Sequence, residues 1–208
     1  MIKNILLAAT IVISSQFYAQ NMAMTASEAK AFVTKLSSDT KNIKTLQSDF
    51  VQTKKMDFLD KNIVTQGRMS LQTPSALSWK YTKPYQYSIL FKNNKIYIND
   101  QGKKSTVDAK SKTLEKINQL IVGSSNGKMF NDPEFKVSYF KNSNYNVARF
   151  VPNTSQLTKY IKQIELYFPK NQSTASQVNM TEASGDTTQI VFKNTKTNAT
   201  IPASEFTY

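Results

Sequence analysis

The sequence alternates apolar and polar residues almost without error from Phe50 to Pro84. Successive side chains of a β-strand point to opposite faces, so this alternation predicts strands with one apolar and one polar face. Pro74 and Pro84 interrupt the pattern and predict turns that make consecutive strands antiparallel neighbours. The predicted apolar face carries Phe50, Met69, Leu71, Leu77, Trp79, Tyr81, Tyr87, Ile89 and Phe91. The predicted polar face carries Arg68, Ser70, Gln72, Ser78, Lys80 and Ser88.

The same pattern recurs at short intervals along the rest of the chain. Asparagine-rich and proline-containing stretches separate the candidate strands, as expected for turns. The apolar side of the later strands adds Ile98, Val137, Leu166 and Met180. We expect eleven strands, at residues 46–53, 63–72, 76–82, 86–92, 95–98, 104–108, 135–140, 145–151, 159–168, 175–182 and 187–193.

Helical spacing is found in two places. Thr25 and Glu28 form a capping box, and it precedes an apolar stripe that predicts a short amphipathic helix. A second stripe falls between residues 111 and 132, where Gly123 ends the helix and residues 124–130 add a further helical turn. The two stripes consist of Phe32, Val33 and Leu36, and of Leu114, Ile117, Leu120 and Ile121.

An apolar sheet face must be covered, and two short helices are small covers for a sheet of this width. The uncovered part has two interpretations. Aromatic stripes at strand spacing are typical of a filled core, but they also line apolar ligand cavities. The pattern alone does not separate these interpretations.

Composition excludes several kinds of chemistry. The 208 residues contain neither His nor Cys, so disulfides, thiol nucleophiles and Cys or His zinc sites are impossible. The chain has only five glycines and neither a Gly-x-Ser-x-Gly motif nor a glycine-rich phosphate loop. Its carboxylates are scattered along turns and polar faces. We therefore expect a protein that is not an enzyme and that uses no cofactor and no metal.

The amino terminus has the layout of a secretory signal peptide. Lys3 is followed by an apolar run over residues 5–13 and then by residues 14–20. That run is shorter than the about 20 residues that span a bilayer. We expect residues 1–20 to be cleaved, leaving a single domain over residues 21–208 in an exported compartment. A buried amino-terminal strand is the alternative. No Cys lies at the junction to carry a lipid anchor.

The formal net charge of +13 comes from 25 Lys and two Arg against 14 acidic residues. The lysines never run longer than pairs, whereas nucleic-acid sites favour concentrated basic patches. We expect no nucleic acid. The charge indicates a solvated surface or, alternatively, attraction to anionic membranes.

Two groups of residues occur in a recognisable order. The first group is Phe50-x-Gln52, Gly67, Pro74-x-x-Leu77-x-Trp79-x-Tyr81 and Pro84. The second group is Gly185, Asp186, Ile190, Phe192, Asn194, Asn198, Ile201 and Phe206. In this order the sequence resembles the LolA family of periplasmic lipoprotein carriers, and the second group resembles the closing hairpin and tail of that family.

The resemblance implies a fold and a site. The fold is mainly β, a curved antiparallel sheet of about eleven strands forming an incomplete barrel, with a lid of two or three short helices on the concave face. The implied acyl cavity consists of Phe50, Met69, Leu71, Leu77, Trp79, Tyr81, Ile89, Phe91, Ile98, Val137, Leu166 and Met180. The implied lid residues are Phe32, Val33, Leu36, Leu114, Ile117 and Ile121.

The resemblance also implies a function and partners. It predicts a soluble periplasmic monomer that carries the acyl chains of lipoproteins from the inner to the outer membrane. An inner-membrane ATP-driven transporter would be the donor and, in some lineages, an outer-membrane receptor the acceptor. Alternatives with the same fold are a carrier or sensor of another acylated lipid or glycolipid, and a lipid-sensing regulatory protein.

One residue departs from the family pattern. Many members have an Arg before the motif proline, where it latches the lid, but this chain has Thr73. Thr cannot reach as far or carry charge. Arg149 is a candidate substitute latch, and an outward surface Arg is the alternative.

Overall fold

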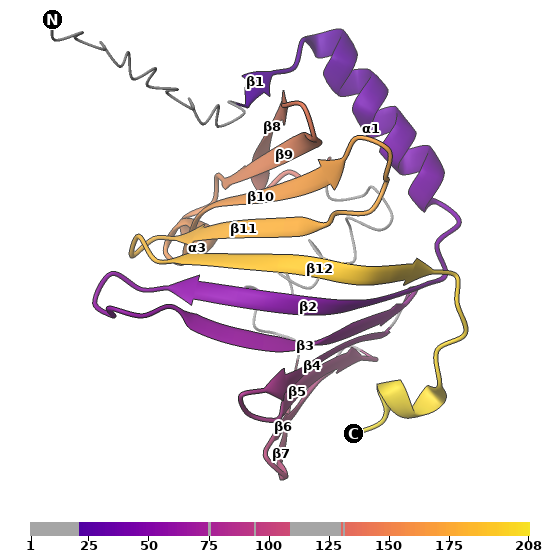
Figure 1. The fold of residues 1–208 in the computed structure, drawn as a ribbon, viewed down its shortest axis with the longest axis vertical. Coiled ribbons are helices and arrows are strands. Elements are labelled where there is room, and N and C mark those ends of the chain that lie inside the picture. Colours follow the sequence, from indigo (N-terminus) through magenta and orange to yellow (C-terminus); the bar gives the residue numbers. More distant parts are fainter. Residues whose placement is uncertain (1–20, 75, 94, 109–129, 131) are drawn as a thin grey trace, which may run out of the picture.

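The computed structural model describes residues 21–208 except 75, 94, 109–129 and 131. Its strands form one twelve-stranded antiparallel sheet in the order β1-β8-β9-β10-β11-β12-β2-β3-β4-β5-β6-β7 (Figure 1). The strands are β1 (Met22–Ala23), β2 (Thr45–Lys55), β3 (Ile63–Gln72), β4 (Ala76–Lys83), β5 (Tyr87–Lys92), β6 (Lys95–Asp100), β7 (Lys103–Asp108), β8 (Phe135–Lys141), β9 (Tyr145–Pro152), β10 (Ile161–Pro169), β11 (Gln177–Glu182) and β12 (Thr187–Thr197).

The sheet is built from two meanders that meet at β12 and β2. β2 to β7 follow one another as neighbours, β8 to β12 do the same, and β12 pairs with β2. The sheet is strongly curved but is not closed into a barrel, because β1 and β7 remain at its two ends (Figure 1). The eleven strands predicted from the sequence are confirmed within a few residues. The twelfth, β1, has two residues and is too short to give a periodic signal.

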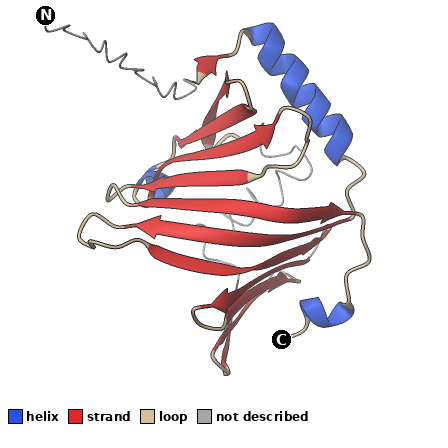
Figure 2. Cartoon of the chain, viewed as in Figure 1, coloured by secondary structure: helices blue, strands red, loops and turns tan. Residues whose placement is uncertain are grey.

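The first predicted helix is confirmed as α1 (Ala26–Thr40), the long helix in Figure 2. Its buried residues are Phe32, Leu36 and Thr40. The capping box is formed, since the Thr25 hydroxyl accepts from the Glu28 amide at 3.3 Å and the Glu28 carboxylate accepts from the Thr25 amide at 3.0 Å. Two other short helices are α3 (Ser155–Thr158) and η2 (Ala203–Phe206).

The predicted lid is only partly covered by the structure. Its second helix, with Leu114, Ile117 and Ile121, lies outside the described residues, as does the predicted signal peptide over residues 1–20. A lid of two or three helices is therefore not established, and α1 is the one predicted lid helix that lies within the described residues.

Two apolar clusters lie on one face of the sheet, which we call the inner face. The first core cluster joins α1 to β8, β9 and β10, and it consists of Phe32, Leu36, Phe130, Phe135, Ala148, Phe150, Leu157, Ile161, Ile164, Leu166 and Phe168. The second core cluster lies over β2, β3 and β4, and it consists of Ile43, Leu46, Phe50, Met69, Leu71, Leu77 and Trp79.

Part of the opposite, outer face is also covered. Phe206 of η2 packs against Ala76 and Leu90, with Tyr97 and Ile201 beside them. The side chain of Lys80 pairs with Glu205 at 2.9 Å in the same region. The alternation predicts a wet outer face, but the carboxy-terminal tail buries this part of it.

Candidate functional site

Strand pairing places all twelve predicted cavity residues on the inner face. Directly paired residues of antiparallel strands point to the same side. Trp79 pairs with Met69 on β3 and with Ile89 on β5, and Ile89 pairs in turn with Ile98. The other connecting pairs are Leu71–Leu77, Leu77–Phe91, Phe50–Gly67, Gly67–Tyr81, Phe50–Phe192, Val178–Ile190, Leu166–Val178, Ile164–Met180, Phe150–Ile164 and Val137–Phe150.

Exposure divides these twelve residues into two groups. The fully packed group contains Phe50, Met69, Leu71, Leu77, Trp79 and Leu166. The half-buried group contains Tyr81, Ile89, Phe91, Ile98, Val137 and Met180. A ligand can contact the half-buried group without displacing the core. The fully packed group forms the core that supports the half-buried side chains. Binding by either group remains a prediction.

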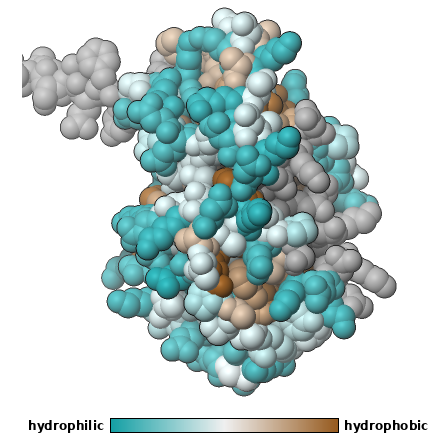
Figure 3. Space-filling model, turned by 90° about the vertical axis from the view of Figure 1, so that its right-hand side faces the viewer, coloured by the Kyte–Doolittle hydropathy of each residue, from teal (hydrophilic) through white to brown (hydrophobic). Residues whose placement is uncertain are grey.

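The accessible part of the inner face continues across the middle of the sheet. Val178, Met180, Ile190 and Phe192 on β11 and β12 are half-buried and lie between the two core clusters. The inner face therefore presents apolar side chains beyond its two core clusters. Seen from the side, the surface of the molecule is largely hydrophilic, with brown apolar patches between the teal side chains (Figure 3).

The tyrosines of this face are neutral at physiological pH. Burial raises the pKa of both Tyr81 and Tyr139 above the usual value for a phenol. The Tyr81 hydroxyl donates to Gln52 at 3.1 Å, which satisfies its polar end inside an apolar surrounding. These side chains add area and hydrogen bonding but no charge.

The helix α1 covers the part of the inner face formed by β8 to β10. The Phe32 ring meets Tyr139 and Phe168 edge-on, with ring centroids 6.1 and 5.5 Å apart, and Val33 packs beside it. Polar contacts fix the two ends of the helix. Glu28 pairs with Lys141 of β8, and Asp39 accepts from Ser173 in the loop between β10 and β11.

The two latch candidates lie in different places. The Thr73 hydroxyl is within 3.1 Å of the carbonyl oxygens of both Ile43 and Lys44, so it ties the turn after β3 to the segment that follows α1. Arg149 lies on the outer face, where its Nε donates to Glu165 at 2.9 Å and its guanidinium stacks on Phe140.

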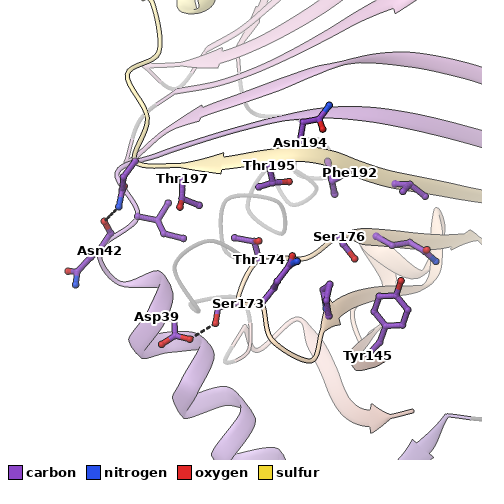
Figure 4. Close-up of a pocket in the computed structure, with 16 residues that line it drawn as sticks. Asp39, Asn42, Tyr145, Ser173, Thr174, Ser176, Phe192, Asn194, Thr195 and Thr197 are labelled. Atoms are coloured by element: carbon purple, nitrogen blue, oxygen red, sulfur yellow. Dashed lines mark hydrogen bonds between the residues drawn. The ribbon is translucent and has the colours of Figure 1, made fainter. Parts of the chain in front are cut away.

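A polar cleft of about 690 Å³ lies beside the carboxy-terminal end of α1, and sequence reasoning missed it (Figure 4). It was predicted only as turns and strand ends. The available signal was two runs rich in Ser, Thr, Asn and Gln, at residues 171–177 and 193–198. Its lining residues are Asp39, Asn42, Ile43, Tyr145, Pro169, Gln172, Ser173, Thr174, Ser176, Gln177, Val191, Phe192, Asn194, Thr195, Thr197 and Asn198.

Comparison with known proteins identifies the family. A family profile described as "Outer membrane lipoprotein carrier protein LolA" matches residues 41–208. The chain belongs to the LolA family. The outer-membrane lipoprotein carrier protein of Chromobacterium violaceum is 26% identical to this LolA-family chain over 200 residues, which cover 94% of this chain and 88% of that protein.

Solved structures share the fold of this LolA-family chain at low sequence identity. The Pseudomonas aeruginosa MucA/MucB complex matches with a TM-score of 0.52 and 10% identity, over 87% of this chain and 61% of that chain. The crystal structure of MucB matches with a TM-score of 0.51 and 8% identity, over 88% of this chain and 63% of that chain. Within the described part of the chain, no helix combines the length and hydrophobicity needed to cross a membrane.

Proposed function

We propose that this protein carries lipoproteins through the periplasm, from the inner to the outer membrane, by binding their acyl chains on its inner face. The observation that carries the proposal is the half-buried apolar group on β4, β5, β6, β8 and β11 in a member of the LolA family. Acyl chains are recognised by apolar area rather than by directional bonds, and this face offers such area.

The energetics favour partial enclosure of the acyl chains. Burial of one CH₂ group stabilises a complex by about 0.8 kcal/mol, and an acyl chain has on the order of 15 such groups. Complete burial of several chains would prevent release. A face whose accessible residues are adaptable side chains such as Met180 and Ile89, backed by a rigid core, suits reversible binding.

Export and partners complete the proposal. Cleavage of residues 1–20 leaves residues 21–208 as a soluble monomeric carrier domain in the periplasm. Because no nucleotide site is recognised in the sequence, loading requires a partner, for which an inner-membrane ATP-driven transporter is proposed. An outer-membrane receptor is the proposed acceptor where one exists.

A second candidate is a regulatory protein that binds lipid or protein. This candidate is supported by the fold that the chain shares with the MucA/MucB complex. This chain covers 61% of that chain at 10% identity, whereas it covers 88% of the Chromobacterium violaceum carrier at 26% identity, so the carrier is preferred. A carrier of glycolipids or other acylated molecules uses the same inner face and differs only in cargo.

Recovery of the natural cargo tests the choice. The protein is purified from the periplasm of its own cells and examined by native mass spectrometry and lipid extraction. Copurifying acylated lipoproteins support the carrier. Free lipid or glycolipid alone supports the alternative cargo, and a bound regulatory protein without lipid supports the second candidate.

The single tryptophan tests where the acyl chains bind. Trp79 is the only tryptophan of the chain and is 6% exposed on the inner face. Fatty acids brominated along the chain should quench its emission. In a matched protein with Trp79→Phe and Thr187→Trp, the reporter lies at an exposed position of β12 and should stay unquenched. Equal quenching of both reporters would contradict binding on the inner face.

A further inference from the structure

The polar cleft lies where the pairing between β11 and β12 ends. It is bounded by the end of α1, by the loop between β10 and β11 and by the last residues of β12 (Figure 4). Ser173 donates to Asp39, and Asn198 accepts from the Lys44 amide at 2.8 Å, so contacts between distant segments fix two sides of the cleft.

The lining residues come from both faces of the sheet. Ile43 belongs to the second core cluster, and Phe192 packs against it on the inner face. The next residue toward the amino terminus, Val191, belongs to the opposite face of β12. It pairs with Gln177, which also lines the cleft. The cleft therefore connects the apolar inner face with the outer surface.

The chemistry of the lining is polar and almost uncharged. Asp39 is the only charged residue among the sixteen described residues that line the cleft, in a chain with a net charge of +13. Lys35 forms an ion pair with that carboxylate and Ser173 donates a hydrogen bond to it, and both contacts lower its pKa below the usual value. None of these described side chains is a cation that would bind a phosphate. Hydroxyl and amide groups instead suit a neutral ligand that both donates and accepts hydrogen bonds.

One edge of the cleft is a strand segment that has a single partner strand among the described residues. β11 pairs with β12 as far as Val191, and the Phe192 amide donates to the Ser176 carbonyl at 2.8 Å. β12 continues to Thr197 with β2 as its only neighbour among the described strands. Its register with β2 shifts between Lys193 and Lys196, Asn194 has a φ of 55°, and the Lys193 carbonyl accepts from the Ser48 hydroxyl at 2.8 Å. The edge of a strand is a template for an extended peptide.

We propose that this cleft binds the polypeptide of an acylated cargo where it leaves the carrier. The residues that follow the acylated one lie along the cleft edge of β12, beside the hydroxyls of Thr174 and Ser176, while the acyl chains rest on the inner face. The inference depends on the proposed carrier function. It adds a second site that recognises peptide main chain and tolerates any cargo sequence.

The test uses two ligands and two tryptophan variants of the full mature chain. One ligand is a fluorescent fatty acid, and the other is a diacylated lipopeptide with a neutral linker of about ten residues, which spans about 33 Å when extended. The linker carries a photoreactive residue. Thr174→Trp fills the cleft from its loop side, and Thr187→Trp places the same side chain at an exposed, remote position of β12.

In the wild type, the linker should cross-link to residues 172–176 and 193–198. Thr174→Trp should bind the lipopeptide about tenfold more weakly, equivalent to about 1.4 kcal/mol, and bind the fatty acid as the wild type does. Thr187→Trp should leave both affinities unchanged. Circular dichroism of each variant checks that it is folded, and cross-linking of the wild type does not depend on any variant.

Other outcomes separate the two proposals. Cross-links outside the cleft, or equal lipopeptide affinities of Thr174→Trp and the wild type, would overturn the peptide site and leave the carrier intact. A neutral glycolipid that loses affinity in Thr174→Trp, while the peptide cross-links elsewhere, would assign the cleft to a sugar instead. Failure of the wild type to bind either acylated ligand would reject the carrier function itself.

Discussion

The Phe50 ring stacks on the Trp79 indole, with ring centroids 4.4 Å apart and planes inclined by 30°. Tyr81 meets the same ring edge-on at 5.3 Å. Gly67 lies beneath it, where an added Cβ would be 2.6 Å from Phe50 Cζ and 2.0 Å from the Lys80 carbonyl oxygen. Phe50, Trp79, Tyr81 and Gly67 thus form one packed unit, because β3 lies between β2 and β4 in the sheet.

We expect Phe50→Ala to destabilise the protein by about 3–5 kcal/mol, the usual cost of truncating a buried Phe. The side chain is 1% exposed, and its removal leaves a cavity beside Trp79, on which it stacks, and Phe192, with which it pairs. Urea unfolding followed by Trp79 emission measures the loss. Thr53→Ala on the same strand, outside both core clusters, is the control. A loss of less than about 1 kcal/mol for Phe50→Ala would contradict the packing described here.

Local pattern was sufficient for much of this architecture. The alternation around Trp79 determined which side chains share the inner face, and the Thr25–Glu28 capping box located the start of α1. Each of these signals depends on a few neighbouring residues, so it can be recognised without knowledge of the rest of the chain.

Contacts between distant segments could not be predicted in the same way. Nothing near Leu90 indicates that Phe206 covers it, and nothing near Ser173 indicates a cleft shared with Thr195. The pairing of Arg149 with Glu165 depends on the register of β9 with β10, which alternation alone does not fix. Sequence reasoning therefore found the apolar face and missed the polar cleft beside it.

We expect Ile89→Glu to weaken acyl-chain binding about tenfold or more, because a carboxylate on an apolar binding face must be desolvated or protonated. Ile89 is half-buried on the inner face, whereas its neighbour Ser88 pairs with Lys80 on the outer face. Ser88→Glu is thus the matched control and should bind normally. Displacement of a fluorescent fatty acid measures both. Similar affinities for the two variants would show that Ile89 is not part of the acyl site.

Arg149→Ala should destabilise the protein by about 1–3 kcal/mol and leave lipid release unchanged. The substitution removes the guanidinium that pairs with the Glu165 carboxylate. Glu165 is 8% exposed and still accepts a hydrogen bond from the Tyr167 hydroxyl at 3.1 Å. The double variant that combines Arg149→Ala with Glu165→Gln should recover part of the lost stability. Altered release kinetics at unchanged stability would instead support Arg149 as the substitute latch.

The attachment of α1 to β8 should weaken at acidic pH. The hydrogen bond from Lys141, helped by the Thr25 amide, lowers the pKa of Glu28 from 4.5 to about 2. A carboxyl with a lower pKa in the folded state stabilises fully above its unfolded pKa, and the contribution is lost as the pH falls toward the folded value. The window therefore runs from about pH 4.5 down to about pH 2.

Thermal unfolding of the wild type and Glu28→Gln over this range checks the assignment. The wild type should be the more stable protein above about pH 5, and the difference should shrink as the pH falls to about 2 and vanish below it, where Glu28 is protonated and both side chains are uncharged. Asp39→Asn serves for comparison at the other end of α1, where the pKa is also lowered. A difference that is independent of pH would rule out ionisation of Glu28 as its cause.

Phe206→Ala should destabilise the outer face without affecting acyl binding. The ring is 5% exposed among Ala76, Leu90 and Tyr97, and truncation of a packed Phe costs about 3 kcal/mol. Tyr208→Ala is the control, since Tyr208 is 39% exposed and should cost less than about 1 kcal/mol. Urea unfolding and fatty-acid binding are measured on both. Since Phe206 and the inner face lie on opposite sides of β4 and β5, weaker binding by a folded Phe206→Ala would mean that the tail controls the curvature of these strands.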